Sequence, residues 1–461
     1  MIRAATGTDW RFGRRFIVVL TMSGLFLSWM IAVAPAAYAE GEAVGTRLVV
    51  TDPESGERVP VEGVGVIVEN AAGEDVGSGT TDAEGTVEVP VPGSGRYGMT
   101  IDIGTLPEGV YLADEERSTV LIEVLPNQVG RGIFQLVNEE ELEDFGLTRG
   151  FSLRALAQLT VEGLKFGIFL AMAAIGLSLI FGTTGLVNFA HGEIVVWGML
   201  WAYLFNVYGL AGFLGFMEGW PPPFGGGVNL IIAALLAIVL GLALGWAMDK
   251  YIFGPLRARG VSLISAMIVT LGLSIFLRYV FLFIFGGVPR FYLDYTAQSG
   301  LDIGPVQITP KDLISAGISV AVLLGVGLFL QKTRIGKAMR AVSDDRDLAE
   351  SSGIDVQRVI RFVWTLGGGL AALGGVFIGL SEVVSWNIGF RILLLIFAAV
   401  VLGGLGTAYG ALVGALIVGI GIQVSTLWIP TELKNVGALV LLIVALLIRP
   451  QGILGRAERV G

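Results

Sequence analysis

The sequence predicts a helical membrane protein with many crossings, preceded by a small exported β-sandwich. Hydrophobic residues make up 54% of the 461 residues and charged residues only 15%, a balance that excludes an ordinary soluble domain. From about residue 155, apolar runs of about 20 residues, the length that crosses a bilayer, follow one another. Residues 40–138 instead alternate short β-branched runs with turn sequences such as PESGE, AAGED and PGSG, which is typical of a β-sandwich.

Charge divides the chain at the same place. Residues 40–145 hold 23 acidic and 5 basic residues, a net charge of −18, whereas the remainder carries +9. This asymmetry separates a solvated acidic region from a membrane region with basic loops, and neither part resembles a nucleic-acid binder. Cysteine is absent, which excludes disulfides, thiol nucleophiles and cysteine-ligated metals.

Residues 1–39 have the pattern of an export signal. Arg11, Arg14 and Arg15 lie just before the apolar run 16–33, which is followed by the small-residue site Ala37-Tyr38-Ala39. The run is long for a signal core, so an uncleaved signal anchor is the alternative to a cleaved signal peptide. Both interpretations place residue 40 outside the cell.

Within residues 40–138, the spacing P-V-E-G-V-x-V followed by T-D-x-x-G resembles the prealbumin-like fold of carboxypeptidase regulatory-like domains. Four acidic residues there have oxygen ligands suitable for calcium, but they are also ordinary turn formers, and we favour turns. These four are Asp52, Asp75, Asp82 and Glu84. The acidic residues 139–154 are expected to be a linker.

The membrane part contains eight apolar segments, one of which is too long for a single span. Residues 403–410, GGLGTAYG, break that long segment into two helices or a re-entrant pair, giving nine crossings. The segments are 157–182, 187–208, 229–249, 263–286, 311–330, 361–381, 390–428 and 433–448.

Loop charge predicts the orientation. The loops 250–262 and 331–361 and the tail after residue 448 are rich in Lys and Arg, whereas the loop 209–228 has none and 287–310 has one. Basic loops stay in the cytoplasm. With nine crossings, residues 40–154 lie outside and the C-terminus inside.

The polar loop 331–361 is longer than a connection needs, with seven basic residues. We expect a cytoplasmic partner to bind it, the alternative being a solvated connector that anchors the inner face.

Polar groups interrupt the apolar run 175–198, where Asn188, the single histidine His191 and Glu193 follow Gly182 and Gly185. Ionisable residues at membrane depth face cavities or other helices, and broken helices expose backbone groups that must line protein or water. We expect either a translocation-path or gating element, or a capped helix start with Asn188 as the cap and Glu193 at the dipole. One histidine with one glutamate is too few ligands for a metal.

A second glycine-rich interruption contains Gly403, Gly404 and Gly406. Paired breaks in two halves are typical of transporters built from repeats, and close packing at small residues is the alternative. Two further expectations concern charged residues in the spans: Arg278 snorkels outward, and Glu162 pairs with Lys165 on one helix.

Five segments, in order, resemble LivH-type subunits of the branched-chain amino-acid ABC permease family, over roughly residues 155–456. They are NFAHGE (188–193), AMIVTLGLSIFLR (266–278), GKAMRAVSDDRDLAESSGIDV (336–356), VVLGGLGTAYGALVGA (400–415) and RPQGILGR (449–456). The exported β-domain is not part of the usual family pattern.

The resemblance implies an ABC importer permease that has no ATPase motif of its own, binds no cofactor and uses ATP through its partners. It implies two cytoplasmic ATPases, a second permease subunit or copy, and an extracytoplasmic binding protein. The segment DLAESSG (347–353) resembles a degenerate EAAxxxG coupling loop, in which a short helix ending at Gly353 presents Ala349 and Ser352 to the ATPase. The expected coupling residues are Gly336, Arg340, Asp347, Ala349, Ser352 and Gly353.

The function predicted from the sequence is therefore the import of branched-chain or related amino acids by alternating access. Urea, short amides or another small metabolite are alternative cargoes. Alternatives from other classes are an ATP-independent channel or ion-coupled carrier, which would show more acidic residues at mid-span, and a membrane-anchored sensor.

Overall fold

The computed structural model describes most of two compact units, Pro35–Ala155 and Leu156–Gly461. Its described residues are 42–51, 58–139 except 71, 94, 114–117, 125–128, 133 and 135, 153–210, 227–429 except 288, 296, 297 and 299, and 433, 436, 437, 439, 440, 443, 447 and 452–455. The predicted export signal lies outside the described residues. So do most of the acidic linker, most of the loop 209–228 and most of the span 433–448.

The first unit is β-rich, as the sequence predicts. A four-stranded sheet has the order β5 (Asp75–Thr80), β4 (Gly65–Asn70), β7 (Gly95–Ile101), β9 (Thr119–Val124). A three-stranded sheet has the order β10 (Val129–Gly132), β1 (Ala43–Arg47), β6 (Thr86–Pro90), with β1 parallel to β10. Two small pairs join β2 (Val49–Thr51) to β3 (Arg58–Pro60) and β8 (Val110–Leu112) to β11 (Leu136–Asn138). The two larger sheets share one apolar core.

Alternation explains this core. In β4 the side chains of Val66 and Val68 are buried while those of Ile67 and Glu69 are exposed, because successive residues of a strand point to opposite faces. The carboxylate of Asp82 accepts the N–H groups of Glu84 and Thr86 in the turn before β6, the turn-forming role favoured from the sequence, whereas Asp75 begins strand β5 and accepts the Gly77 N–H there. Asp52 lies outside the described residues.

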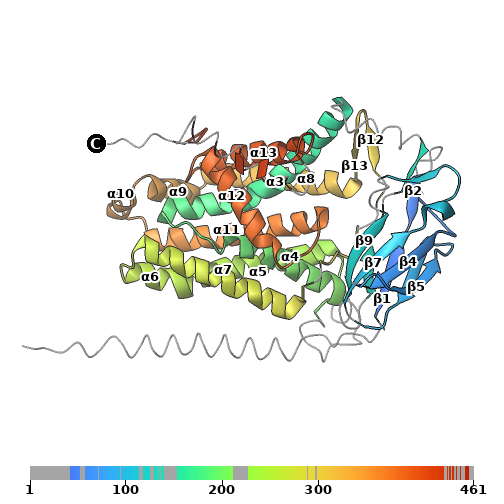
Figure 1. Ribbon diagram of the computed structural model, residues 1–461. Helices are drawn as coiled ribbons and strands as arrows, with labels where there is room; N and C mark the ends of the chain where they lie inside the picture. The colour runs from blue at the N-terminus through green and yellow to red at the C-terminus, as the bar shows by residue number, and fades with distance from the viewer. Residues whose placement is uncertain are drawn as a thin grey trace, which may run out of the picture. The chain divides into compact units, whose positions relative to one another are not determined.

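The second unit is a helical bundle (Figure 1). Its first half contains α3 (Leu153–Thr184), α4 (His191–Tyr208), α5 (Leu230–Ala247), the π-helix η4 (Met248–Phe253), α6 (Gly254–Ala258) and α7 (Leu263–Phe285). A hairpin of β12 (Leu301–Ile303) and β13 (Val306–Ile308) follows. The second half contains α8 (Pro310–Lys332), α9 (Arg334–Asp344), α10 (Arg346–Ser351), α11 (Val356–Ser381), α12 (Ile388–Gly403) and α13 (Ala408–Ser425).

Six of these helices are long and apolar enough to cross a membrane, and α12 is a shorter apolar helix. Helix α4 has 18 residues, among them the polar His191, Glu193 and Asn206. The long segment 390–428 divides into two helices at the predicted glycine-rich break. Helix α4 begins four residues later than expected, because residues 185–190 are not helical. The chain is a helical, multi-pass membrane protein in which a β-rich region precedes the helices in the sequence. The count of nine crossings stays a prediction, because the last span lies almost wholly outside the described residues.

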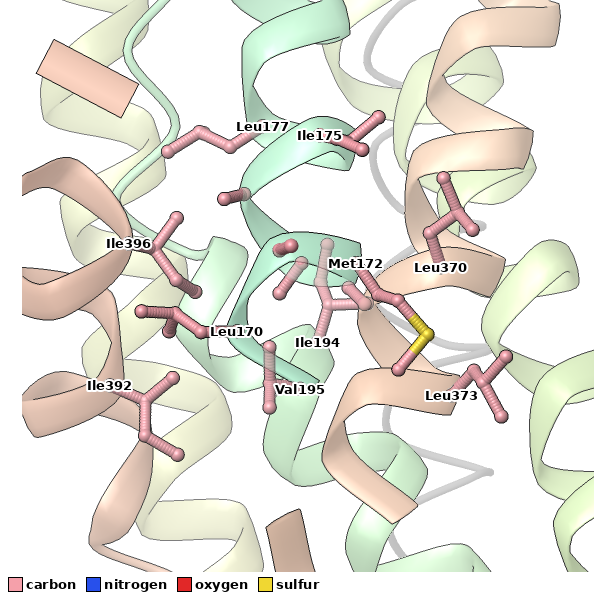
Figure 2. Close-up of a cluster of buried hydrophobic side chains, with 14 of the residues drawn as sticks. Leu170, Met172, Ile175, Leu177, Ile194, Val195, Leu370, Leu373, Ile392 and Ile396 are labelled. Carbon is pink, nitrogen blue, oxygen red and sulfur yellow. The ribbon is translucent and has the colours of Figure 1, made fainter. Parts of the chain in front are cut away.

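Burial separates inner helices from outer ones. Of the apolar stretch of each helix, 83% is buried in α11 and 72% in α3, against 22% in α7 and α8. Side chains from α3, α4, α11 and α12 converge on one cluster, shown in Figure 2 by Leu170, Ile194, Leu373 and Ile396. The outer helices α5, α7 and α8 present isoleucine, leucine and phenylalanine outward, which suits contact with lipid.

Glycines set the close spacing of the inner helices. A Cβ added at Gly375 of α11 would lie 1.9 Å from the carbonyl oxygen of Val195 in α4, and one at Gly368 would lie 2.5 Å from that of Gly241 in α5. Without a water-driven hydrophobic effect between helices, such backbone approach supplies the packing contacts that hold a membrane bundle together.

Gly368→Leu is expected to destabilise the protein by about 1–3 kcal/mol or more, because the new side chain would overpack the contact between α5 and α11. Gly272→Leu on α7 is the matched control, since a Cβ there meets nothing within 4 Å. The measurement is the midpoint of thermal unfolding of the purified protein in detergent. Equal midpoints for the two variants would contradict this packing.

Candidate functional site

The break between α3 and α4 is built from backbone bonds and one amide side chain. Gly185 has a φ of 70° and donates its N–H to the Phe181 carbonyl, which ends α3. Asn188 then accepts the Ala190 N–H at its Oδ1 and the His191 N–H at its backbone oxygen. The Asn188 side chain therefore supports the turn before α4, but the N-cap residue is Ala190, which has no side-chain cap bond, so the expectation that Asn188 caps the helix is wrong.

His191 joins the two helices on either side of the break. Its side chain is fully buried, and its Nε2 lies 2.9 Å from the carbonyl oxygen of Ala173 in α3. Its Nδ1 is buried without a hydrogen-bond partner, as are Asn188 Nδ2 and Glu193 Oε2. Three such atoms within six residues are unusual, since nearly all buried polar atoms are paired. Within the described residues, no group of histidine, aspartate and glutamate is arranged to hold a metal.

Glu193 forms a buried ion pair that the sequence analysis missed. Its Oε1 accepts hydrogen bonds from Nη2 (3.0 Å) and Nε (3.2 Å) of Arg278 on α7 and from Ser274 Oγ (3.3 Å). The expectation that Arg278 snorkels outward is wrong, because a buried carboxylate at 1% side-chain exposure needs an internal cation. The Arg278 guanidinium also lies 5.1 Å from the Phe390 ring centroid on α12.

A second pairing expectation is also wrong. Lys165 Nζ binds Asp312 Oδ2 on α8 at 3.0 Å, while Glu162 accepts a hydrogen bond from Gln158. A partner on another helix replaces the neighbour on the same helix because Asp312 lies in the first turn of α8, where the N-terminal dipole favours an anion.

The two glycine-rich breaks meet each other. A Cβ on Gly182 would lie 2.9 Å from the Gly406 carbonyl oxygen and 2.8 Å from Ser343 Oγ on α9. Ser178 Oγ donates to the Thr407 carbonyl at 3.1 Å. Residues more than 220 positions apart in the sequence thus form one contact, which also touches the loop 331–361.

Helices α12 and α13 form an antiparallel hairpin around the second break. A Cβ on Gly403 would lie 1.8 Å from the Gly410 oxygen, and Gly404 and Gly406 have positive φ values of 114° and 78°, a backbone conformation that other residues rarely adopt. Ile453 and Leu454 of the RPQGILGR motif donate their N–H groups to the carbonyls of Leu402 and Gly403 at 2.8 and 2.9 Å. This distant segment therefore satisfies carbonyls left open at the end of α12.

The loop 331–361 folds into two short helices. In α10, Gly353 has a φ of 84°, and the bonds from Gly353 N–H to Glu350 and from Ile354 N–H to Ala349 form a Schellman motif. This confirms the predicted helix end at Gly353. In Figure 1, α9 and α10 lie at the same end of the bundle as α6, opposite the hairpin of β12 and β13, as the alternation of loop charges requires.

The side chains of α9 and α10 divide into inner and outer sets. Ala349 is only 4% exposed, so the expectation that it faces an ATPase groove is wrong: it packs α10 against the protein. Leu348 is 65% exposed beside it, and Ser352, Asp347 and Arg340 are also exposed. Gly336 is buried, and a Cβ there would lie 2.5 Å from the carbonyls of Phe329 and Leu330, so it permits the fold of α9 onto α8.

Sequence reasoning missed one further charged group in the spans. Asp249, in the π-helix, is fully buried and pairs with Arg257 and, at 3.4 Å, with Arg361 at the start of the α11 span. Asp249 ends the apolar run 229–249, and an acidic residue there was the available signal.

Several buried helices, two contacting breaks and a buried intramembrane ion pair define a multi-pass membrane protein of the transport class. The chain belongs to the family of branched-chain amino acid transport system permease components, whose model matches residues 159–446. It is a transport subunit, the permease component of an ABC system, and not an enzyme. This decides against the ATP-independent carrier and the sensor. The partner ATPases of such permeases use ATP.

Several curated relatives are described as permease proteins of branched-chain amino acid transport. The high-affinity branched-chain amino acid transport system permease protein LivH of Escherichia coli K12 is 32% identical over 311 residues, covering 65% of this chain and 96% of that protein. BraD of Pseudomonas aeruginosa is 31% identical over 313 residues, with the same coverage. The probable LivH of Methanocaldococcus jannaschii is 28% identical over 318 residues, covering 65% and 92%. The β-rich unit precedes the residues matched by the family model.

Arg278→Met is expected to destabilise the protein by about 3–5 kcal/mol, because Glu193 would stay buried with no cation. The double variant Glu193→Gln/Arg278→Met is expected to recover part of that loss, since no lone charge remains. Thermal unfolding in detergent measures both. If the single and double variants unfold at the same temperature, the ion pair does not set the stability of this region.

Proposed function

We propose that this chain is the gate of an ABC importer for branched-chain or related amino acids, moved by two cytoplasmic ATPases that bind α9 and α10. A second permease subunit or copy completes the pathway, and an extracytoplasmic binding protein delivers the amino acid. The alternatives of urea or a short amide as cargo have no observation here in their favour.

One observation supports this mechanism above all. Gly182 lies against both Gly406 and Ser343, so the junction of the two helix breaks touches the loop that the ATPases would bind. When ATP closes the ATPases, a displacement of α9 acts directly on the ends of α3 and of the α12–α13 hairpin. Glycines with positive φ at positions 185, 404 and 406 place hinge-like backbone at that junction. Such a two-state element is what coupling between distant sites requires.

The residues of the first break fit a gating role. Asn188, His191 and Glu193 are sealed inside the protein and line no open path in this structure. Their unpartnered atoms would gain partners if α4 shifted against α3 and α7. A buried group without a hydrogen-bond partner destabilises the conformation that contains it. A second conformation that supplies the partner is then closer in free energy, which favours exchange between the two.

The orientation proposed here places residues 40–154 outside and the C-terminus in the cytoplasm. It is supported by the basic loops at the α6, α9 and α10 end (Figure 1) and by the poorly basic hairpin region at the other end. The β-rich unit would then lie outside the membrane, on the same side as the binding protein. The predicted anchor or signal, which lies outside the described residues, would deliver it there.

Leu348→Arg is expected to reduce co-purification of the ATPases with the permease by at least about tenfold, because an exposed leucine on a docking helix is a candidate anchor and a charge there would be desolvated. Leu121→Arg, at an 80% exposed leucine of the β-rich unit, is the matched control. ATPases retained at the wild-type level by Leu348→Arg would refute docking at α10.

Single cysteines test the orientation cleanly, because the natural chain has none. Ser352→Cys is expected to react with a membrane-impermeant maleimide only in inverted vesicles, and Thr80→Cys only in intact cells or spheroplasts. The extent of labelling is read on gels. Labelling of both positions from the same side would overturn the proposed topology.

A further inference from the structure

A cluster of charged side chains lies at the α6 end of the bundle (Figure 1), where η4 and α6 meet the first turns of α11. The Phe253 ring of η4 stacks on the Trp364 ring of α11, with 4.5 Å between the ring centroids. The guanidinium of Arg257 in α6 donates hydrogen bonds to Asp249 in η4 and, at 3.3 Å, to Gln357 in α11. Three segments of the chain are thus held together at this end.

Cations outnumber acids in this cluster. Asp249 is fully buried and binds two guanidinium groups, those of Arg257 and Arg361. Arg361 reaches it only through Nε, at 3.4 Å, so the two Nη atoms have no hydrogen-bond partner among the described residues, and the side chain is 45% exposed. Lys250, the residue after Asp249, is exposed and has no acidic partner in the described part of the chain. One buried carboxylate is therefore accompanied by three cations, and two of these reach the surface.

Aromatic rings indicate that this cluster lies at the edge of the bilayer. The Lys250 ammonium lies 4.2 Å from the Trp246 ring centroid and 5.2 Å from that of Tyr251, and both rings are exposed. Tryptophan, tyrosine and lysine at the end of an apolar helix are typical of the depth of the lipid headgroups. The cluster directly follows α5, which ends at Ala247.

An apolar stripe runs along α5 to these cations. Ile232, Leu235 and Val239 are exposed, and Trp246 follows Val239 by seven residues, spacings that place all four on one face of a helix. Lys250 lies over the Trp246 ring at the inner end of this face. The face is therefore apolar along its length and positively charged at its end, which matches the acyl chain and the phosphate of a phospholipid.

We propose that this surface binds one anionic phospholipid, whose phosphate accepts hydrogen bonds from Arg361 and Lys250 while an acyl chain lies along the exposed face of α5. A phosphate offers charged oxygens to the two free Nη atoms of Arg361 and to the ammonium, and charge-assisted bonds of this kind are the strong ones. A zwitterionic lipid would bring its own cation to a cluster that already has too many. The surface therefore prefers a headgroup with a net negative charge.

The bound lipid would act on the loop 331–361, because Arg361 is its last residue. The phosphate would hold the start of α11 to η4, next to the segment that the ATPases would bind. In the proposed orientation this lipid belongs to the cytoplasmic leaflet. Only the choice of leaflet depends on that orientation, and the binding surface is the same whatever the protein transports.

Native mass spectrometry of the delipidated full chain in detergent measures the binding. The probes are palmitoyl-oleoyl phosphatidylglycerol and palmitoyl-oleoyl phosphatidylcholine, which share their acyl chains and differ in headgroup. We expect one phosphatidylglycerol to bind at least about tenfold more tightly than phosphatidylcholine, and millimolar inorganic phosphate to leave it bound. Equal affinities for the two lipids would overturn the proposal. Displacement of the lipid by phosphate alone would also overturn it, because the site would then be one for a free anion.

Two single variants identify the cations. Lys250→Gln and Arg361→Gln are each expected to weaken phosphatidylglycerol binding about fivefold and to leave phosphatidylcholine binding unchanged, because each removes one charge near the membrane surface. Lys332→Gln, which removes an exposed cation at the end of α8, is the matched control and should change neither affinity. Unchanged binding in both Lys250→Gln and Arg361→Gln would contradict the assignment.

Two further outcomes are decisive. An equal loss of binding in Lys332→Gln would show an effect of general surface charge and would refute a defined site. If Arg361→Gln does not fold, Lys250→Gln decides, because the Lys250 side chain makes no hydrogen bond or ion pair with any described residue and the pair of Asp249 with Arg257 stays intact.

Discussion

A bilayer offers no water to a backbone or side-chain polar group, so every interruption of a helix in this protein must be satisfied from within. The backbone of the break between α3 and α4 meets this requirement through Asn188, the Phe181 carbonyl and the Thr270 hydroxyl, which accepts the Phe189 N–H at 3.1 Å. The charge of Glu193 is met by Arg278 on a different helix. Helix α7 is therefore tied to α4 by an ion pair as well as by apolar packing.

The same requirement explains why the two breaks lie together. Two irregular segments that contact each other, with Ser343 of α9 beside them, cover exposed backbone from both sides and need less of the bundle to shield them. The glycines that allow this approach also leave positive-φ backbone at the junction. A structural necessity of the membrane thus brings α9 into contact with both helix breaks at one junction.

Local sequence patterns predicted the architecture and failed at pairings between distant residues. Apolar runs of membrane length and glycine-rich interruptions depend on neighbouring residues only, and they predicted the helices of the described part of the bundle, the division of 390–428 and the helix end at Gly353. The pairs Glu193 with Arg278 and Lys165 with Asp312 depend on which helices pack together, which no local pattern encodes. The predicted exposure of Ala349 was wrong for another reason. Adjacent residues of a helix lie on different faces, and in a helix of under two turns only packing decides which face is buried.

The segment Gly452–Gly455 bonds to carbonyls at the end of α12 that nothing else in the described chain satisfies in this way. Those carbonyls are synthesised well before their partners leave the ribosome. The end of α12 therefore acquires these two donors only after translation has passed Leu454. A change that moved the backbone of Ile453 or Leu454 would leave the Leu402 and Gly403 carbonyls without these partners.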